Sequence, residues 1–279
     1  MRTNDIPFFI GDKRAMISLG PLSPKKYCTY SCPFCYVHSG FLKYKSWDIH
    51  SIKQWLHAHK DAYDIIYVSG DTDSFAKPRT ELGLQLLESL VAFDVDVLFT
   101  TRHVFHTAHL RRIRKLSEAL AKKGNTLFGC VSVAQLNHGY LEPKPIRPPL
   151  ERIEQLRRFK EAGLCTILAM RPFLPVVPKE EYREIINLSE GAFDIALGES
   201  WYVDNKGILE KKVFHGMGQE DIVFEESTMD FDDNEDVWKV WKGEAIEALL
   251  RKMASEKGFP FFMRSRPAIE WYRKSKKRG

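Results

Sequence analysis

The chain has 279 residues, of which 44% are hydrophobic and 28% are charged, so it is long enough to bury a substantial core. This composition excludes a fibrous, an intrinsically disordered or a miniature disulfide-rich protein. The formal net charge of +5 is concentrated at one end, because residues 264–279 hold seven Lys or Arg and one Asp or Glu, leaving 35 basic and 36 acidic residues elsewhere. The basic run 273–278 has two interpretations, a solvated terminus or a segment that attracts nucleic acid or another acidic partner.

No segment of the sequence has the features of a targeting signal or a membrane span. The N-terminal apolar stretch is interrupted by Asp12, Lys13 and Arg14, and no later apolar run approaches the length of a transmembrane helix. We therefore expect a cytoplasmic protein with no membrane partner. In a reducing compartment, five cysteines favour metal binding or catalysis over disulfides, and three of the five lie within eight residues.

Strand and helix patterns alternate along the first two thirds of the chain. Short apolar segments rich in strand-forming residues predict strands over residues 15–19, 65–69, 95–101, 126–133, 166–170 and 193–197. Apolar positions between them recur at three- and four-residue spacing, which predicts helices over residues 49–60, 81–92, 104–123, 150–162 and 180–190. The predicted fold class is therefore α/β, a partial (β/α)6 TIM-like barrel whose active groups lie at the carboxyl ends of the strands.

The pattern changes near residue 200. We assign residues 1–200 to the core barrel and residues 201–279 to a C-terminal extension that packs on it and ends in the basic tail. Within the extension we expect a hairpin-like stretch at 201–207, an acidic solvated loop at 230–236, a helix near 237–256 and a short strand at 259–263.

The three clustered cysteines form the motif Cys28-Thr-Tyr-Ser-Cys32-Pro-Phe-Cys35, in the long loop after the first predicted strand. Its spacing lets three thiolates from one tight loop bind one face of a 4Fe–4S cubane and leaves the fourth iron open. An open iron can chelate the amino and carboxylate groups of a methionine moiety. The alternative is a zinc site, in which His38 and the three cysteines are the ligands. These local residues fit both about equally well.

Motifs elsewhere in the chain decide between the two. The cysteine motif, with an aromatic residue just before its last cysteine, resembles that of the radical S-adenosylmethionine (radical SAM) superfamily. Four short motifs then follow in the order found in the branch that contains spore photoproduct lyase. They are Leu141-Glu-Pro143, Glu151-Arg152, Glu161-Ala-Gly163 and Arg171-Pro-Phe-Leu-Pro175. The resemblance covers about residues 15–200.

The resemblance implies roles for individual residues. Cys28, Cys32 and Cys35 would be the cluster ligands, and Phe34 and Tyr36 would flank the adenine. The segment Ser69-Gly70-Asp71-Thr72-Asp73 stands where the superfamily binds the methionine amino group, with Ser69 in place of a glycine and with Ser69, Gly70, Asp71 and Thr72 as the implied cofactor-binding residues. The other implied cofactor-binding residues are Arg102, which either holds the SAM carboxylate or caps a helix, and Ser132.

Cys130 has two interpretations. In an alternating strand it shares a face with Ser132, so both point inward or both point outward. An inward thiol beside SAM could return hydrogen to a product radical, whereas a small cysteine within the barrel is also a common core residue.

The implied reaction is that of the superfamily. A reduced 4Fe–4S cluster donates one electron to SAM, which releases methionine and a 5′-deoxyadenosyl radical that abstracts hydrogen from a substrate. No second cysteine-rich segment is present, so a single cluster is expected, with a reductant such as flavodoxin or ferredoxin. The branch and the basic tail favour a nucleic acid or nucleotide substrate. A peptide or small metabolite, or a non-catalytic iron–sulfur or zinc protein, are the alternatives.

Overall fold

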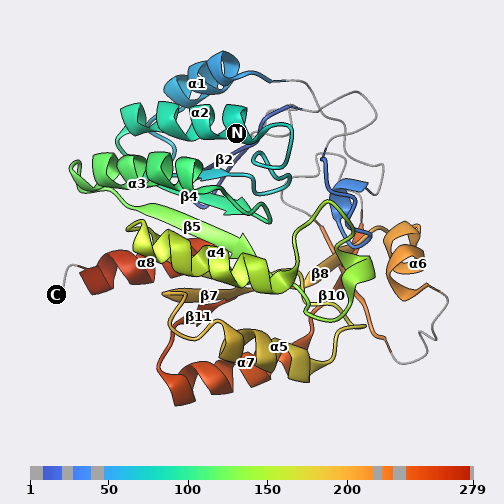
Figure 1. Ribbon diagram of the computed structural model, residues 1–279. Helices are drawn as coiled ribbons and strands as arrows, with labels where there is room; N and C mark the ends of the chain where they lie inside the picture. Colours follow the sequence, from blue (N-terminus) through green and yellow to red (C-terminus); the bar gives the residue numbers. More distant parts are fainter. Residues whose placement is uncertain (1–8, 21–27, 39–46, 216–221, 229–236, 277–279) are drawn as a thin grey trace.

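The computed structural model describes residues 9–20, 28–38, 47–215, 222–228 and 237–276 (Figure 1). Its strands are β1 Phe9–Gly11, β2 Arg14–Ile17, β3 Ile65–Val68, β4 Asp96–Thr101, β5 Leu127–Ser132, β6 Cys165–Met170, β7 Ile195–Gly198, β8 Trp201–Val203, β9 Glu225–Ser227, β10 Trp238–Trp241 and β11 Phe261–Phe262. Its α-helices are α1 Ile49–Ala58, α2 Thr80–Leu90, α3 Thr107–Ala121, α4 Pro149–Glu161, α5 Lys179–Leu188, α6 Ile208–Phe214, α7 Glu244–Lys257 and α8 Ser265–Lys276, with short 3-10 helices η1 Tyr36–His38, η2 Val91–Phe93 and η3 Gly139–Leu141.

The main sheet has the order β1-β2-β3-β4-β5-β6-β7-β11 and curls into a half-barrel. Strands β2 to β7 are the six predicted strands, and they pair in parallel in chain order. Helices α1 to α5 are the five predicted helices, with ends shifted by a few residues. Helix α4 begins at Pro149, whose fixed φ suits a first helical turn, and is followed by Gly163 at φ +81°. The predicted partial barrel is confirmed.

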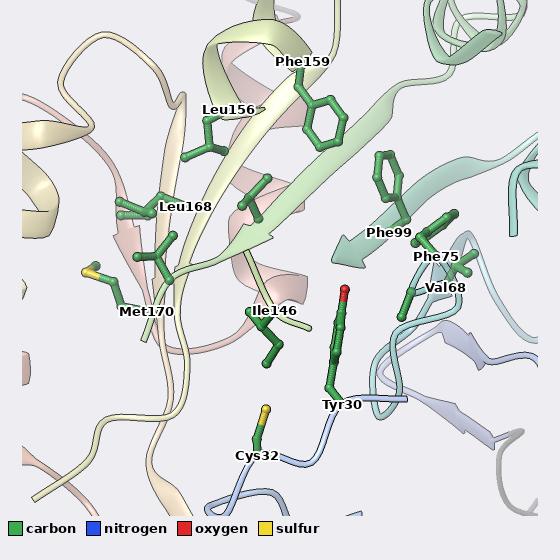
Figure 2. Packing of buried hydrophobic residues seen from close by; sticks show 14 of the residues in the cluster. Tyr30, Cys32, Val68, Phe75, Phe99, Ile146, Leu156, Phe159, Leu168 and Met170 are labelled. Atoms are coloured by element: carbon green, nitrogen blue, oxygen red, sulfur yellow. The ribbon is translucent and has the colours of Figure 1, made fainter. Parts of the chain in front are cut away.

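The two faces of this sheet are buried in different ways. Side chains that alternate outward join the helices in a large apolar core, part of which Figure 2 shows around Phe99, Leu156, Phe159 and Leu168. Inward side chains form a smaller core inside the half-barrel, and α8 contributes to it. The inner core consists of Ile65, Tyr67, Leu98, Phe128, Cys130, Cys165, Ile167, Ala169, Ile195, Leu197, Ala268 and Ile269.

The C-terminal part of the chain differs from the prediction in its details. Residues 201–203 form β8, which pairs with β10 far along the chain and not with an adjacent strand. The predicted helix at 237–256 starts only at Glu244, because Trp238 and Val240 alternate with more exposed neighbours and form β10 between β8 and β9. The predicted short strand exists as β11 and extends the main sheet beside β7. The expected acidic loop at 230–236 lies outside the described residues.

The basic C-terminal segment is helical as far as Lys276 and docked as far as Arg273, whereas Lys274, Ser275 and Lys276 are exposed to solvent. Helix α8 packs inside the half-barrel, where the Tyr272 ring meets Phe128 edge-on with 5.3 Å between centroids. Arg273 donates Nε to Asp96 (2.7 Å) and Nη1 to Asp64 (3.3 Å) at the amino ends of β4 and β3. Apolar burial and ion pairing override the tendency of a charged terminus to stay in water. None of the helices in the described part of the chain has the length and apolar character needed to span a bilayer.

Candidate active site

A cavity of about 370 Å³ opens at the carboxyl ends of the parallel strands. The loops that follow β2, β3 and β4 and the last residue of β5 all line it, because parallel strands bring their carboxyl ends to one edge of a barrel. The residues predicted for the site that line this cavity are Cys28, Cys32, Phe34, Cys35, Tyr36, Ser69, Gly70, Asp71, Thr72, Arg102 and Ser132. Of the predicted site residues, Cys130 alone does not line it.

The three cysteines of the motif are largely removed from solvent. Cys28 and Cys32 are buried, and the Cys35 amide donates to the Cys32 carbonyl at 3.1 Å to close a tight turn. Figure 2 shows the Cys32 sulfur directed from the loop towards Ile146 and the strand ends. Burial raises the pKa of all three thiols, that of Cys35 to about 12, so without a cation they are protonated.

The segment after β3 is held in a strained, close-fitting turn. Ser69 has a φ of +66°, a conformation that favours glycine, and its hydroxyl accepts from the Ser74 amide at 3.0 Å. A Cβ at Gly70 would lie 2.7 Å from the Met16 methyl, so a larger residue there would have to displace the Met16 side chain. The Asp71 carboxylate accepts from the Ser18 hydroxyl and from the Thr72 amide at 2.8 Å.

Asp73, the last residue of the Ser69–Asp73 motif and the one to which the sequence assigned no role, fixes this segment to β4. Its carboxylate accepts from the Thr101 hydroxyl at 3.0 Å, the Arg102 amide at 2.7 Å and the Phe75 amide at 2.9 Å. Burial raises its pKa despite these bonds. The only signal in the sequence was a second carboxylate two residues after Asp71.

Arg102 lies in a network of buried charges. Its Nε donates to Glu142 at 2.9 Å, its Nη2 donates to the Arg171 carbonyl at 3.3 Å, and its guanidinium lies 5.6 Å from the centre of the Phe34 ring. Glu142 also accepts from both terminal nitrogens of the fully buried Arg152. Glu142 of the Leu-Glu-Pro motif and Arg152 of the Glu-Arg motif thus form an ion network that holds Arg102 against the cysteine loop.

Ser132 and Cys130 share the inward face, as the alternation of β5 predicted. The buried Ser132 hydroxyl lines the cavity, and no described residue offers it a hydrogen-bond partner. Such a group usually has a partner, which here would be a bound molecule. Cys130 lies deeper, in the inner core beside Thr100, and burial raises its thiol pKa.

The small sheet β8-β10-β9 holds the two aromatic residues of the motif. The Trp201 indole Nε1 donates to the Phe34 carbonyl at 3.0 Å, and the Trp238 ring lies edge-on to Tyr36 with 6.5 Å between centroids. Neither tryptophan carries a signal in the sequence, because no local pattern shows which distant loop a tryptophan reaches.

The chain matches the family model of the radical SAM superfamily over residues 22–189, more than half of its length. The chain belongs to the radical SAM superfamily. It is therefore a radical SAM enzyme, and the resemblance expected from the motifs is confirmed. None of the curated proteins matches it.

Several solved radical SAM structures share its fold. A spore photoproduct lyase mutant, in which a cysteine is replaced by serine, has a TM-score of 0.69 at 14% identity, covering 94% of this chain and 81% of the other. Spore photoproduct lyase complexed with dinucleoside spore photoproduct has a TM-score of 0.64 at 14% identity, covering 93% and 76%. SuiB from Streptococcus suis, bound to S-adenosylmethionine, has a TM-score of 0.58 at 13% identity; 88% of this chain is covered, but it spans only about half (51%) of SuiB.

The residues present fit the cofactors that the superfamily implies. Three thiols, two buried and one partly buried, line one cavity. Each cysteine of a 4Fe–4S cluster binds a different iron, so they need not converge on one ion. Among the described side chains, no three of His, Cys, Asp or Glu surround a single ion position. The unpartnered Ser132 hydroxyl and the close-packed Gly70 turn lie on the same cavity, where SAM would be held.

Proposed function

We propose that Cys28, Cys32 and Cys35 hold one 4Fe–4S cluster and that the enzyme cleaves SAM reductively there to transform a nucleic acid or nucleotide. The observation that carries this proposal is the shared cavity: the three cysteines, the Ser69–Thr72 turn, Arg102 and the Ser132 hydroxyl all line it. The similarity to spore photoproduct lyase complexed with a dinucleoside spore photoproduct supports the substrate class.

When bound, the cluster and SAM supply a 5′-deoxyadenosyl radical that abstracts hydrogen from the substrate. The chain itself binds and orients. The Ser69–Thr72 turn and Ser132 would position the methionine part and the nucleoside part of SAM, and Phe34 and Tyr36 would flank the adenine. Arg102 brings positive charge to the cysteine loop, held there by Glu142.

The surroundings of the cysteines would protect this chemistry. Buried Tyr30 and Phe34 exclude water from the cavity wall, which protects a reactive intermediate. We propose a cytoplasmic reductant such as flavodoxin or ferredoxin as the source of the electron. Cys130 would return hydrogen to the product radical only if the substrate reached past the cavity-lining residues into the inner core, where Cys130 lies.

The proposal is tested by anaerobic reconstitution followed by measurement of iron content and 5′-deoxyadenosine formation. We expect about four irons per chain, and loss of both iron and SAM cleavage in Cys28→Ala, Cys32→Ala and Cys35→Ala, because three ligands leave none spare. Cys165→Ala is the matched control, since Cys165 is buried at the start of β6 and does not line the cavity. Stoichiometric zinc, or SAM cleavage that persists in Cys32→Ala, would contradict the proposal.

A further inference from the structure

A second group of polar side chains lines the same cavity, and neither the cluster nor SAM accounts for it. Arg14 comes from β2, Tyr67 from β3, Arg171 follows β6 and Glu199 follows β7. All four are contributed by the strands or strand ends of the half-barrel. No sequence motif had assigned a role to any of their side chains.

Arg171 is the member of this group that forms no direct ion pair among the described residues, although the charge of Glu199 acts on it and helps to raise its pKa. Its Nε donates to the Gly198 carbonyl at 3.3 Å, and the Tyr67 hydroxyl lies beside the guanidinium. Glu199 lines the same cavity and is the main source of negative charge for Arg171, but it does not form a salt bridge with the guanidinium. The other cationic side chains near the cysteines are matched, since Glu142 binds both Arg102 and Arg152.

Arg14 adds a second, weakly matched positive charge. Its Nη1 donates to the Ser265 hydroxyl at 2.7 Å, and its one ionic partner among the described residues is Asp12 at 3.5 Å, whose side chain is 54% exposed. Burial lowers the pKa of Arg14, and the charge of Arg171 lowers it further. Two partly buried guanidinium groups that lack a bidentate carboxylate partner are incompletely compensated, and a planar anion with two oxygens compensates them best.

We infer that Arg171, with the Tyr67 hydroxyl and Arg14 beside it, binds an anionic group of the substrate, either a carboxylate or a phosphate. This inference rests on the proposed function, because it places the substrate in the cavity that would hold SAM. It assigns the SAM end of the cavity to Arg102, which lies against the cysteine loop, and the substrate end to Arg171, which faces Tyr67 and the Gly198 carbonyl.

The test uses reconstituted enzyme with SAM, into which inorganic phosphate and acetate are titrated separately at constant ionic strength in a calorimeter. We expect the wild type to bind at least one of these anions, and Arg171→Gln to weaken that binding roughly tenfold or more. Arg171→Lys should lose less anion affinity than Arg171→Gln, because lysine keeps the positive charge but not the paired N–H donors of the guanidinium. Arg147→Gln is the control, since Arg147 is an exposed arginine that does not line the cavity.

Each outcome separates the alternatives. Preference for phosphate supports a nucleotide-like substrate and preference for acetate a carboxylate substrate, and both uphold the anion site. Equal anion binding by wild type and Arg171→Gln, or no binding by the wild type, overturns it. Loss of SAM affinity in Arg171→Gln without a change in anion affinity also overturns it, because Arg171 then belongs to the cofactor site. If the wild type binds no SAM, the proposed function fails, while the anion titration without SAM still tests Arg171.

Discussion

At the scale of single residues, Glu142 is a position where substitution should be costly, because several buried groups bind its carboxylate. One carboxylate, 1% exposed, serves Arg102, Arg152 and the Gln135 amide at 2.9 Å. Buried ion pairs add little net stability when complete, but removing one partner leaves the others charged and unpaired. The network therefore positions Arg102 and adds little net stability while it is complete, but removing one of its members destabilises the protein.

We expect Glu142→Gln to lower the free energy of unfolding by about 3 kcal/mol or more, because two guanidinium groups lose their counter-charge. Urea unfolding at pH 7 measures this. Glu151→Gln is the matched control: its exposed pair with Arg147 should contribute less than about 1 kcal/mol. Equal losses in the two variants would show that the network is not the source of the effect.

The same carboxylate predicts acid sensitivity. Burial alone raises the pKa of Glu142, but Arg152 and Arg102 outweigh burial and hold the pKa below its ordinary value. A group with a lowered folded-state pKa contributes stability above its unfolded pKa, about 4.3, and loses that contribution as pH falls. The stability difference between wild type and Glu142→Gln should thus be largest near neutral pH and shrink below about pH 4. A difference that does not vary with pH would contradict this.

At the scale of elements, α8 closes the half-barrel at the amino ends of the strands. Arg273 ties it to Asp64 and Asp96, and Arg266 also pairs with Asp64. We expect Arg273→Ala to destabilise the protein by about 1–3 kcal/mol, because the largely buried Asp96 loses its charged partner. Lys274→Ala, at the next position, should change stability by less than about 0.5 kcal/mol. Thermal unfolding of both variants decides.

The docked helix also fixes how the nucleic-acid proposal can be tested. Truncation after Arg273 removes Lys274, Lys276, Lys277 and Arg278 but keeps the contacts to Asp64 and Asp96. If this segment contacts a polyanion, affinity for DNA or RNA should fall and its salt dependence should flatten, because fewer counterions are released. Substrate-free SAM cleavage should not change.

Binding titrations at several salt concentrations, with single- and double-stranded DNA and RNA, provide the measurement. Absence of binding at low salt in both full-length and truncated protein would remove nucleic acid and leave a nucleotide, peptide or small metabolite. Figure 1 places the C-terminal end of α8 at the side of the sheet away from the cysteine loop, so a polyanion held there would have to extend around the barrel to reach the cavity.

At the scale of the whole molecule, residues far apart in the chain hold the cysteine loop. Trp201 reaches across 167 positions to the Phe34 carbonyl. We expect Trp201→Phe to keep the ring packing but lose this hydrogen bond, worth about 1 kcal/mol, and therefore to release iron faster to a chelator. Trp271→Phe, an exposed tryptophan on α8, is the control. Equal release rates in the wild type and Trp201→Phe would show that the small sheet does not secure the loop.

The sequence by itself determined the barrel and the cysteine loop, because both depend on local patterns. Apolar periodicity specified β2 to β7 and α1 to α5, and cysteine spacing within eight residues indicated one loop that brings three thiols together, which the structure places on the cavity. Alternation in β5 correctly placed Cys130 and Ser132 on one face. Each of these signals depends on residues that are neighbours in the chain.

Only the tertiary structure decided which charges meet. The basic residues of α8 could have been solvated or bound to a polyanion, and the fold pairs Arg266 and Arg273 with Asp64 and Asp96. Glu142 could have been any surface acid, and the fold buries it between two arginines. Among the described residues Arg171 has only one carboxylate, that of Glu199, near it and forms no direct ion pair, although the chain contains 37 acidic residues. Ion pairing depends on distances between elements that loop lengths and packing set, and a charge in the sequence carries no information about its partner.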